Sequence, residues 1–132
     1  MSYPGKESYI SGRRGEEIAA EYIKQQGFFI AARNYRYDIG EIDIIAENRK
    51  FVVFIEVKTR NENAGYFPKE AITKDKQRRI IHTAKNYMYR SHTGLIPRFD
   101  IIEVTIPENG DTESAEVSHI ENAFEVRGNE FY

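Results

Sequence analysis

The sequence predicts one α/β (α+β) domain with a central mixed β-sheet flanked by helices. Two segments carry apolar residues at helical spacing, and between and after them lie runs rich in β-branched and aromatic residues. Two of those runs are separated by a short polar break, which is typical of a hairpin. The 132 residues are enough for one hydrophobic core, and no repeat or second domain boundary is apparent. This order of elements predicts one sheet covered by helices.

The first helix is expected to begin at Ser11 or Gly12 and to end at Gln26, before a glycine. Its apolar face consists of Ile18, Tyr22 and Ile23, with Ala19 and Ala20 beside it. Glu16 falls in the expected first turn, where the helix dipole stabilises a carboxylate. The expected organisation is a flexible N-terminal arm, a single domain and a C-terminal tail, at 1–11, 12–124 and 125–132.

The residues after this helix divide into an apolar and a polar part. Phe28–Ala32 is expected to be a short outer strand, and Arg33–Tyr37 is expected to be a turn. Arg33 and Arg36 could contact phosphates, and the neighbouring tyrosines could stack on bases. A solvated turn with aromatic packing is the simpler interpretation of the same residues.

The centre of the chain contains the predicted hairpin. Ile42–Ile45 is apolar except for Asp43, and Phe51–Lys58 is apolar until it reaches Glu56 and Lys58. Charged side chains are rarely buried unless they are paired or used. These three residues therefore mark either a functional site or a hairpin end where the strands emerge into water.

The expected register brings two of the carboxylates together. A loop over 47–50 places Asp43 opposite Phe54 and Glu41 opposite Glu56. Neighbours on one face of a sheet lie roughly 5–8 Å apart, so Asp43 and Glu56 could share one hard cation through oxygen ligands. A loop one residue longer or shorter would move Asp43 to the other face.

Lys58 completes a set of side chains that suits phosphodiester hydrolysis. A Mg²⁺ or Mn²⁺ ion held by Asp43 and Glu56 would polarise a phosphoryl oxygen and lower the pKa of a bound water. Lys58 could orient or deprotonate that water, or stabilise the charge that develops on the phosphorus centre. Short motifs also occur by chance, so spacing alone leaves open a plain surface ion pair between Glu56 and Lys58.

GEIDIIA followed by FIEVKTR resembles the (D/E)…(D/E)xK signature of the restriction-endonuclease-like superfamily. More closely, the chain is similar to the YraN-like family, a group of proposed endonucleases related to Holliday-junction resolvases. The resemblance covers roughly residues 12–124, and one departure is Ile55 where the family pattern has valine. The other matching motifs are Gly15-Glu16 with Ala19 and Tyr22, then Lys76, Arg98-Phe99-Asp100, and His119–Phe124.

The resemblance implies a restriction-endonuclease-like sheet with the carboxylates gathered at one edge. It implies Asp43 and Glu56 as ligands of Mg²⁺ or Mn²⁺, Lys58 as the residue that positions water, and Glu16 as an assisting acid. The implied activity is hydrolysis of phosphodiester bonds in DNA, including branched or junction DNA. A homodimer is compatible with this activity because junction-cutting enzymes must nick two strands.

A second helix is expected from Thr73, its N-cap, to Gly94. Its core stripe consists of Ile80, Ala84, Tyr87 and Met88. The other side is basic, and we interpret it as a surface that follows a nucleic-acid backbone rather than a merely solvated face. Its expected phosphate contacts are Lys74, Lys76 and Arg78, together with Arg60 at the end of the hairpin.

Two more strands are expected, over 99–106 and, at the sheet edge, over 115–121. Asp100 is expected to orient Arg98 or a lysine rather than to bind metal. Phe124 is expected to fill part of the core.

Composition limits the possible classes. The formal net charge is −2, unusual for a DNA-binding domain, but seven basic residues lie between 69 and 90 and seven acidic ones after 107. The absence of cysteine excludes disulfides and thiolate metal sites. No apolar run approaches the roughly 20 residues that cross a bilayer, so no membrane partner is expected and the predicted location is cytoplasmic.

Two other functions remain compatible with the sequence. One is a nucleic-acid-binding module that does not cleave, which should bind DNA with strong salt dependence. The other is a protein-interaction scaffold that keeps a vestigial site and uses its acidic C-terminal part.

Overall fold

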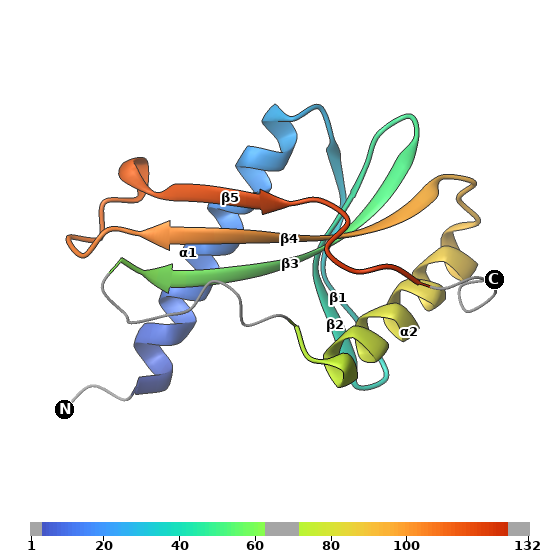
Figure 1. Cartoon of the computed structure of the whole chain (residues 1–132), viewed down its shortest axis with the longest axis horizontal. Coiled ribbons are helices and arrows are strands. Elements are labelled where there is room, and N and C mark those ends of the chain that lie inside the picture. The colour runs from blue at the N-terminus through green and yellow to red at the C-terminus, as the bar shows by residue number, and fades with distance from the viewer. Residues whose placement is uncertain (1–3, 63–71, 127–132) are drawn as a thin grey trace.

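The computed structural model describes residues 4–62 and 72–126, with side chains from residue 12 onward (Figure 1). The elements are α1 (Pro4–Gln25), β1 (Phe29–Tyr37), β2 (Gly40–Glu47), β3 (Phe51–Asn61), α2 (Lys74–Ser91), β4 (Ile96–Ile106), a 3₁₀ turn (Thr112–Ser114) and β5 (Glu116–Ile120). The strands form one five-stranded sheet in the order β1-β2-β3-β4-β5. Because β3 and β4 are parallel and the other neighbours antiparallel, the sheet is mixed, as predicted.

The two helices cover opposite faces of this sheet. Ala19, Ala20 and Ile23 of α1 pack on one face with Val53 and Ile55 of β3. On the other face, Ile80 and Ala84 of α2 pack with Val52 and Phe54. The predicted apolar stripes of both helices are thereby confirmed. This is the α+β arrangement expected of a restriction-endonuclease-like core.

The sheet forks in its middle. The β2–β3 ladder runs from Glu47–Val52 only as far as Ile44–Ile55. The β3–β4 ladder, in contrast, continues to the pair Asn61–Ile106. Figure 1 shows the result, with β1 and β2 turned steeply across the direction of β3, β4 and β5. We call the point where β2 leaves β3, after Ile44–Ile55, the fork.

The predicted hairpin register is wrong by two residues. Phe54 lies opposite Ile45 instead of Asp43. The reason is the Asn48 side chain, whose Oδ1 accepts hydrogen bonds from the backbone N–H groups of Lys50 at 2.9 Å and Phe51 at 2.7 Å. Glu47 therefore pairs with Val52, the Asn48 N–H donates to the Phe51 carbonyl oxygen at 3.0 Å, and the turn is centred on Arg49 and Lys50. A shift of two residues preserves the faces of the paired residues, but the ladder ends at Ile44–Ile55, before Asp43.

Two predicted boundaries near the N-terminus are also wrong. Helix α1 begins at Pro4, so Glu16 lies well inside the helix and gains nothing from its N-terminal dipole. Residues 33–37 belong to β1 rather than to a turn. Pairing with β2 continues to Tyr37–Gly40, and cross-strand packing overrides the polar composition of this segment. The turn falls instead at Asp38, which has a positive φ of 56°.

Helix α2 has the predicted start and an earlier end. Thr73 is its N-cap, and the side chain accepts a hydrogen bond from the Lys76 N–H. His92 closes the helix in the left-handed conformation, two residues before Gly94. The expected edge strand is confirmed as β5, which pairs with β4 alone. Phe124 stacks on Phe99 with 4.9 Å between ring centroids, as expected of a core residue.

The β1–β2 hairpin rests closely on α2. A side chain at Gly40 would place its Cβ 2.1 Å from Thr83 Oγ1 and 2.7 Å from the Arg79 carbonyl oxygen, so only glycine fits there. The part of the expected C-terminal tail from 127 onward lies outside the described residues. Within the described part of the chain, no helix has the length and apolar character needed to cross a membrane.

Candidate active site

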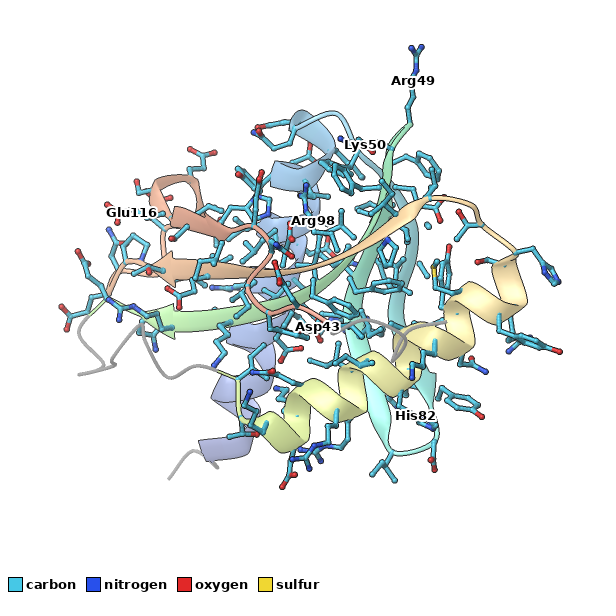
Figure 2. The ribbon with its side chains drawn as sticks, turned by 45° about the vertical axis from the view of Figure 1, so that its right-hand side comes forward. Asp43, Arg49, Lys50, His82, Arg98 and Glu116 are labelled. Carbon is cyan, nitrogen blue, oxygen red and sulfur yellow. The ribbon has the colours of Figure 1, made fainter. Side chains whose placement is uncertain are left out.

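The alternation of side chains along β2 breaks next to the fork. Ile44 packs with the α1 side of the core, whereas Ile42 and Ile45 both pack with the α2 side. A regular strand would place Ile42 and Ile44 on one face and Ile45 on the other. Asp43 lies inside this break, and Figure 2 shows it near the centre of the molecule, where β2 and β3 separate.

Asp43 is held in place by the backbone of β3. Its Oδ2 accepts a hydrogen bond of 2.8 Å from the Val57 N–H. The backbone ladder has already ended at Ile44–Ile55, so the carboxylate replaces the acceptor that β2 no longer supplies. The divergence of the strands therefore determines where the Asp43 carboxylate lies.

Three carboxylates meet at the fork. Asp43 is in hydrogen-bonding contact with Glu56 of β3 and with Glu16 of α1. Burial raises the pKa of Asp43 to about 8, the charges of Glu56 and Glu16 add to the increase, and the Val57 N–H opposes it. Burial also raises the pKa of Glu16, against the opposing charge of Arg33 and the hydrogen bond with Asp43. Three carboxyl groups are therefore close together where solvation is reduced, and this favours the protonated form of Asp43.

Glu16 reaches the fork because α1 passes very close to β3. A Cβ at the neighbouring Gly15 would lie 1.7 Å from Thr59 Oγ1, a separation that no side chain can occupy. Glycine at position 15 thus permits the helix contact that carries Glu16 to Asp43. Asn34 of β1 supports it, since its amide nitrogen, in the orientation that satisfies its neighbours, donates to Glu16 Oε1 at 3.1 Å and to Glu41 Oε1 at 3.2 Å.

Two lysines approach the carboxylates from the α2 side of the sheet. Lys76, in the first turn of α2, places its Nζ 2.5 Å from Glu56 Oε1. Lys58 lies two residues after Glu56 on β3 and shares its face. The register pairs Lys58 with Glu103 of β4, so those two side chains are neighbours on that face.

The donor set fits Mg²⁺ or Mn²⁺ through two residues. Within the ranges described, no three or more His, Asp or Glu side chains form a group that could hold a metal ion. Asp43 and Glu56 are adjacent, and carboxylate oxygens are the donors that these hard cations prefer. Mg²⁺ commonly takes one or two carboxylates and fills its remaining positions with water and substrate phosphates. Both expected ligands are therefore suitably placed.

Comparison with known proteins identifies the family. Residues 15–104 match the family described as “Uncharacterised protein family UPF0102”. The chain belongs to the UPF0102 family. A UPF0102 protein of Clostridium botulinum (strain Loch Maree / Type A3) is 46% identical over 117 residues, covering 87% of this chain and 94% of that protein. A UPF0102 protein of Syntrophotalea carbinolica is 44% identical over 118 residues, covering 89% and 93%. The predicted YraN-like membership is confirmed.

The cations expected to contact nucleic acid divide into two groups in this UPF0102 protein. Those on β3 and the first turns of α2 are Arg60, Lys74, Lys76 and Arg78. Arg33 and Arg36 lie on β1 and are paired with Glu17 at 2.7 Å and Glu41 at 3.4 Å, respectively. In the first group, Lys76 contacts Glu56, and Arg60 lies two residues after Lys58 on the same face of β3. In the second group, Arg33 is close enough to Glu16 for its charge to oppose the rise in the pKa of that carboxyl.

Asp100 anchors a separate, buried network in this UPF0102 protein. It accepts hydrogen bonds from Arg98 Nε at 3.0 Å, Arg98 Nη2 at 2.8 Å and the Asn122 N–H at 3.0 Å. His119 Nε2 lies 2.7 Å from the same carboxylate, and His119 Nδ1 lies 3.0 Å from the Tyr22 hydroxyl. Burial alone would raise the pKa of Asp100, but the hydrogen bonds from His119 and Arg98 outweigh it and lower the pKa. Asp100 thus orients Arg98, as expected.

Sequence reasoning missed two features of the UPF0102 site. Glu103 was not singled out, although a glutamate inside the apolar run of β4 is unusual, and it is only 8% exposed. The contact between Lys76 and Glu56 had no local signal, because the two residues belong to separate elements. The clearest available hint was the family resemblance at Lys76.

Proposed function

We propose that this UPF0102 protein is a Mg²⁺- or Mn²⁺-dependent endonuclease that hydrolyses phosphodiester bonds in DNA, including branched DNA. The observation that carries the proposal is the meeting of Glu16, Asp43 and Glu56 from three different elements. A structural role for this arrangement is hard to find, because close carboxylates repel one another in a partly buried setting. Perturbed carboxylates grouped in this way occur preferentially at functional sites.

The negative charge that three close carboxylates would carry at the fork must be compensated. A proton on Asp43 is one solution, and its pKa of about 8 means that it holds that proton at neutral pH. A divalent cation between Asp43 and Glu56 is the other solution, and it would leave both carboxylates ionised. The site is therefore matched to a cation that arrives with, or is completed by, an anionic substrate.

Each residue at the fork then has a distinct task. Bound Mg²⁺ or Mn²⁺ would supply Lewis-acid polarisation of the phosphoryl oxygen and a more acidic water. Asp43 and Glu56 provide the carboxylate oxygens that hold it. Lys58 lies beside Glu56 on the same face, where its ammonium can orient the attacking water or stabilise the negative charge of the transition state. Glu16 approaches Asp43 from α1 and supports its position.

The cations nearest to Lys58 would bind the DNA backbone. Arg60 continues β3 beyond Lys58, and Lys74 and Arg78 lie in the first turns of α2. Contacts of this kind position a phosphate without reading the base sequence. They also give binding that weakens steeply with salt. A substrate recognised by its shape fits this arrangement better than one recognised by its sequence.

Cleavage of a labelled DNA panel tests the proposal. The panel contains a four-way junction, a flap, a single strand and a plain duplex, each with Mn²⁺, Mg²⁺ or EDTA. Wild type is compared with Asp43→Asn, Glu56→Gln and Lys58→Ala, and Glu116→Gln on the exposed edge strand serves as a matched control. Metal-dependent cutting that survives only in wild type and Glu116→Gln is the expected result.

Two other outcomes would reject the proposed endonuclease activity. Equal cutting by wild type and all variants would identify a contaminating nuclease. Salt-sensitive binding of a branched substrate without cleavage would favour a non-cleaving DNA-binding module instead.

A further inference from the structure

We infer that Lys76 acts as a stand-in cation for Glu56 when no metal is bound, and that it releases Glu56 and turns to a substrate phosphate when the metal site fills. This inference rests on the proposed function and specifies how the same site is regulated. It gives Lys76 a role different from that of a constant phosphate contact. The residue would be a positioning residue whose partner changes during the reaction.

The first support is the geometry of the contact. Lys76 Nζ lies 2.5 Å from Glu56 Oε1, and the Glu56 side chain is only 11% exposed. An ammonium group at this distance occupies space beside a carboxylate that is also a candidate metal ligand. A divalent cation bound to the same carboxylate oxygen would repel the ammonium strongly. We therefore expect filling of the site to displace the Lys76 side chain from Glu56 Oε1.

The second support is that Lys76 has a fixed backbone and a movable side chain. Its N–H donates to the Thr73 hydroxyl at 3.2 Å, which anchors the residue in the first turn of α2. The adjacent Gln77 side chain donates to the Ile72 carbonyl oxygen at 2.9 Å and fixes the same turn. The Lys76 side chain is 43% exposed, so it can swing toward solvent while the helix stays in place. The ammonium then remains at a helix N-terminus, close to where a backbone phosphate would lie.

The third support is the contrast with Arg78. Arg78 lies two residues further along α2, but its guanidinium pairs with Asp75 at 2.7 Å, and both side chains are largely exposed. It contributes positive charge to the same end of the helix without touching a carboxylate of the fork. Arg78 therefore provides a matched control for the effect of charge on Mn²⁺ binding, which is measured without DNA.

Mn²⁺ binding, measured without DNA, tests the first half of the inference. Titrations followed by electron paramagnetic resonance compare wild type with Lys76→Gln, Lys76→Arg, Arg78→Gln and Asp43→Asn. We expect Lys76→Gln to bind Mn²⁺ about tenfold more tightly, since a charge-assisted contact no longer has to be broken. Lys76→Arg and Arg78→Gln should remain near wild type, and Asp43→Asn should lose binding.

DNA binding tests the second half of the inference, that Lys76 turns to a substrate phosphate. Affinity for a four-way junction is measured over a range of salt concentrations, with Ca²⁺ as the divalent cation. Lys76→Gln should bind the junction more weakly because one phosphate contact is missing. The slope of log affinity against log salt concentration should also decrease by about one. Tighter metal binding together with weaker DNA binding is the combination that a purely structural lysine would not produce.

The outcomes separate this inference from the proposed function. Equal or weaker Mn²⁺ binding by Lys76→Gln, with binding still lost in Asp43→Asn, overturns the role of Lys76 and leaves the metal site intact. An unchanged salt dependence in Lys76→Gln also overturns it. Absence of Mn²⁺ binding in wild type and in every variant would instead reject the metal site, and the proposed function with it.

Discussion

The carboxylate of Asp43 on β2 accepts a hydrogen bond from the backbone N–H of Val57 on β3, at the point where the two strands separate. One side chain thus completes the secondary structure and also carries the charge that the proposed chemistry needs. Because asparagine keeps an acceptor oxygen without the charge, substitutions at this position can separate the two roles.

Asp43→Asn should fold normally and lose cleavage, whereas Asp43→Ala should also lose stability. Alanine leaves the Val57 N–H without its acceptor, and an unpaired buried donor costs about 1–3 kcal/mol. Urea unfolding at pH 6 would measure the difference between the variants. Equal stabilities of the asparagine and alanine variants would mean that the hydrogen bond is unimportant for the fold.

Without metal, the stability of the protein should fall as pH rises. The pKa of Asp43 is raised from 3.8 to about 8, so between these values the folded protein holds a proton that the unfolded chain has lost. The free energy of unfolding therefore decreases with pH across this window. Urea titrations at pH 5 and pH 8.5 should show the decrease in wild type and a smaller one in Asp43→Asn. Added Mn²⁺ should restore wild-type stability at pH 8.5.

Gly15→Ala should destabilise the protein and disturb the position of Glu16. The new Cβ would lie 1.7 Å from Thr59 Oγ1, so α1 must move away from β3. Overpacking of this kind typically costs about 1–3 kcal/mol. Gly12→Ala is the control, because no atom lies within 4 Å of its Cβ position and alanine favours the helix. Thermal unfolding should rank Gly12→Ala at or above wild type and Gly15→Ala below it.

Asp100→Asn should be strongly destabilising, because it leaves the Arg98 guanidinium with an uncompensated charge. Removing one partner of a buried pair typically costs about 3–5 kcal/mol. Asp75→Asn breaks the exposed pair with Arg78 and should cost less than about 1 kcal/mol. Since the pKa of Asp100 is lowered, its contribution is present above the ordinary aspartate pKa and is lost as the pH falls through the folded value. Acid unfolding should therefore begin at a higher pH in the asparagine variant.

Glu103→Gln should lower kcat with little change in KM. Lys58 and Glu103 are neighbours in the register of the parallel β3–β4 ladder, so we expect the charge of Glu103 to help to hold the Lys58 ammonium in position. Small misplacements of a catalytic group can reduce rates by up to about 100-fold. Steady-state cleavage assays would give kcat and KM for this variant and for Glu116→Gln, which changes an exposed residue of β5. A matching decrease in both variants would point to a general effect of lost negative charge.

Local sequence determined much of this protein. Thr73 as N-cap, the apolar stripe of Ile80 and Ala84, and the hairpin with Asp43 and Glu56 follow from side-chain periodicity and capping chemistry. These features depend on residues a few positions apart, so the sequence encodes them directly. Because side chains alternate with a period of two, an error of two residues in the register left the faces of the paired residues unchanged.

Tertiary structure alone decided how the site is assembled. The fork, the entry of Glu16 past Gly15 and the contact of Lys76 with Glu56 each join elements that are distant in the chain. No periodic pattern in the sequence encodes such contacts, because they depend on how two helices pack on opposite faces of one twisted sheet. The sequence therefore indicated which residues are candidates for the proposed chemistry, and packing determined which of them meet.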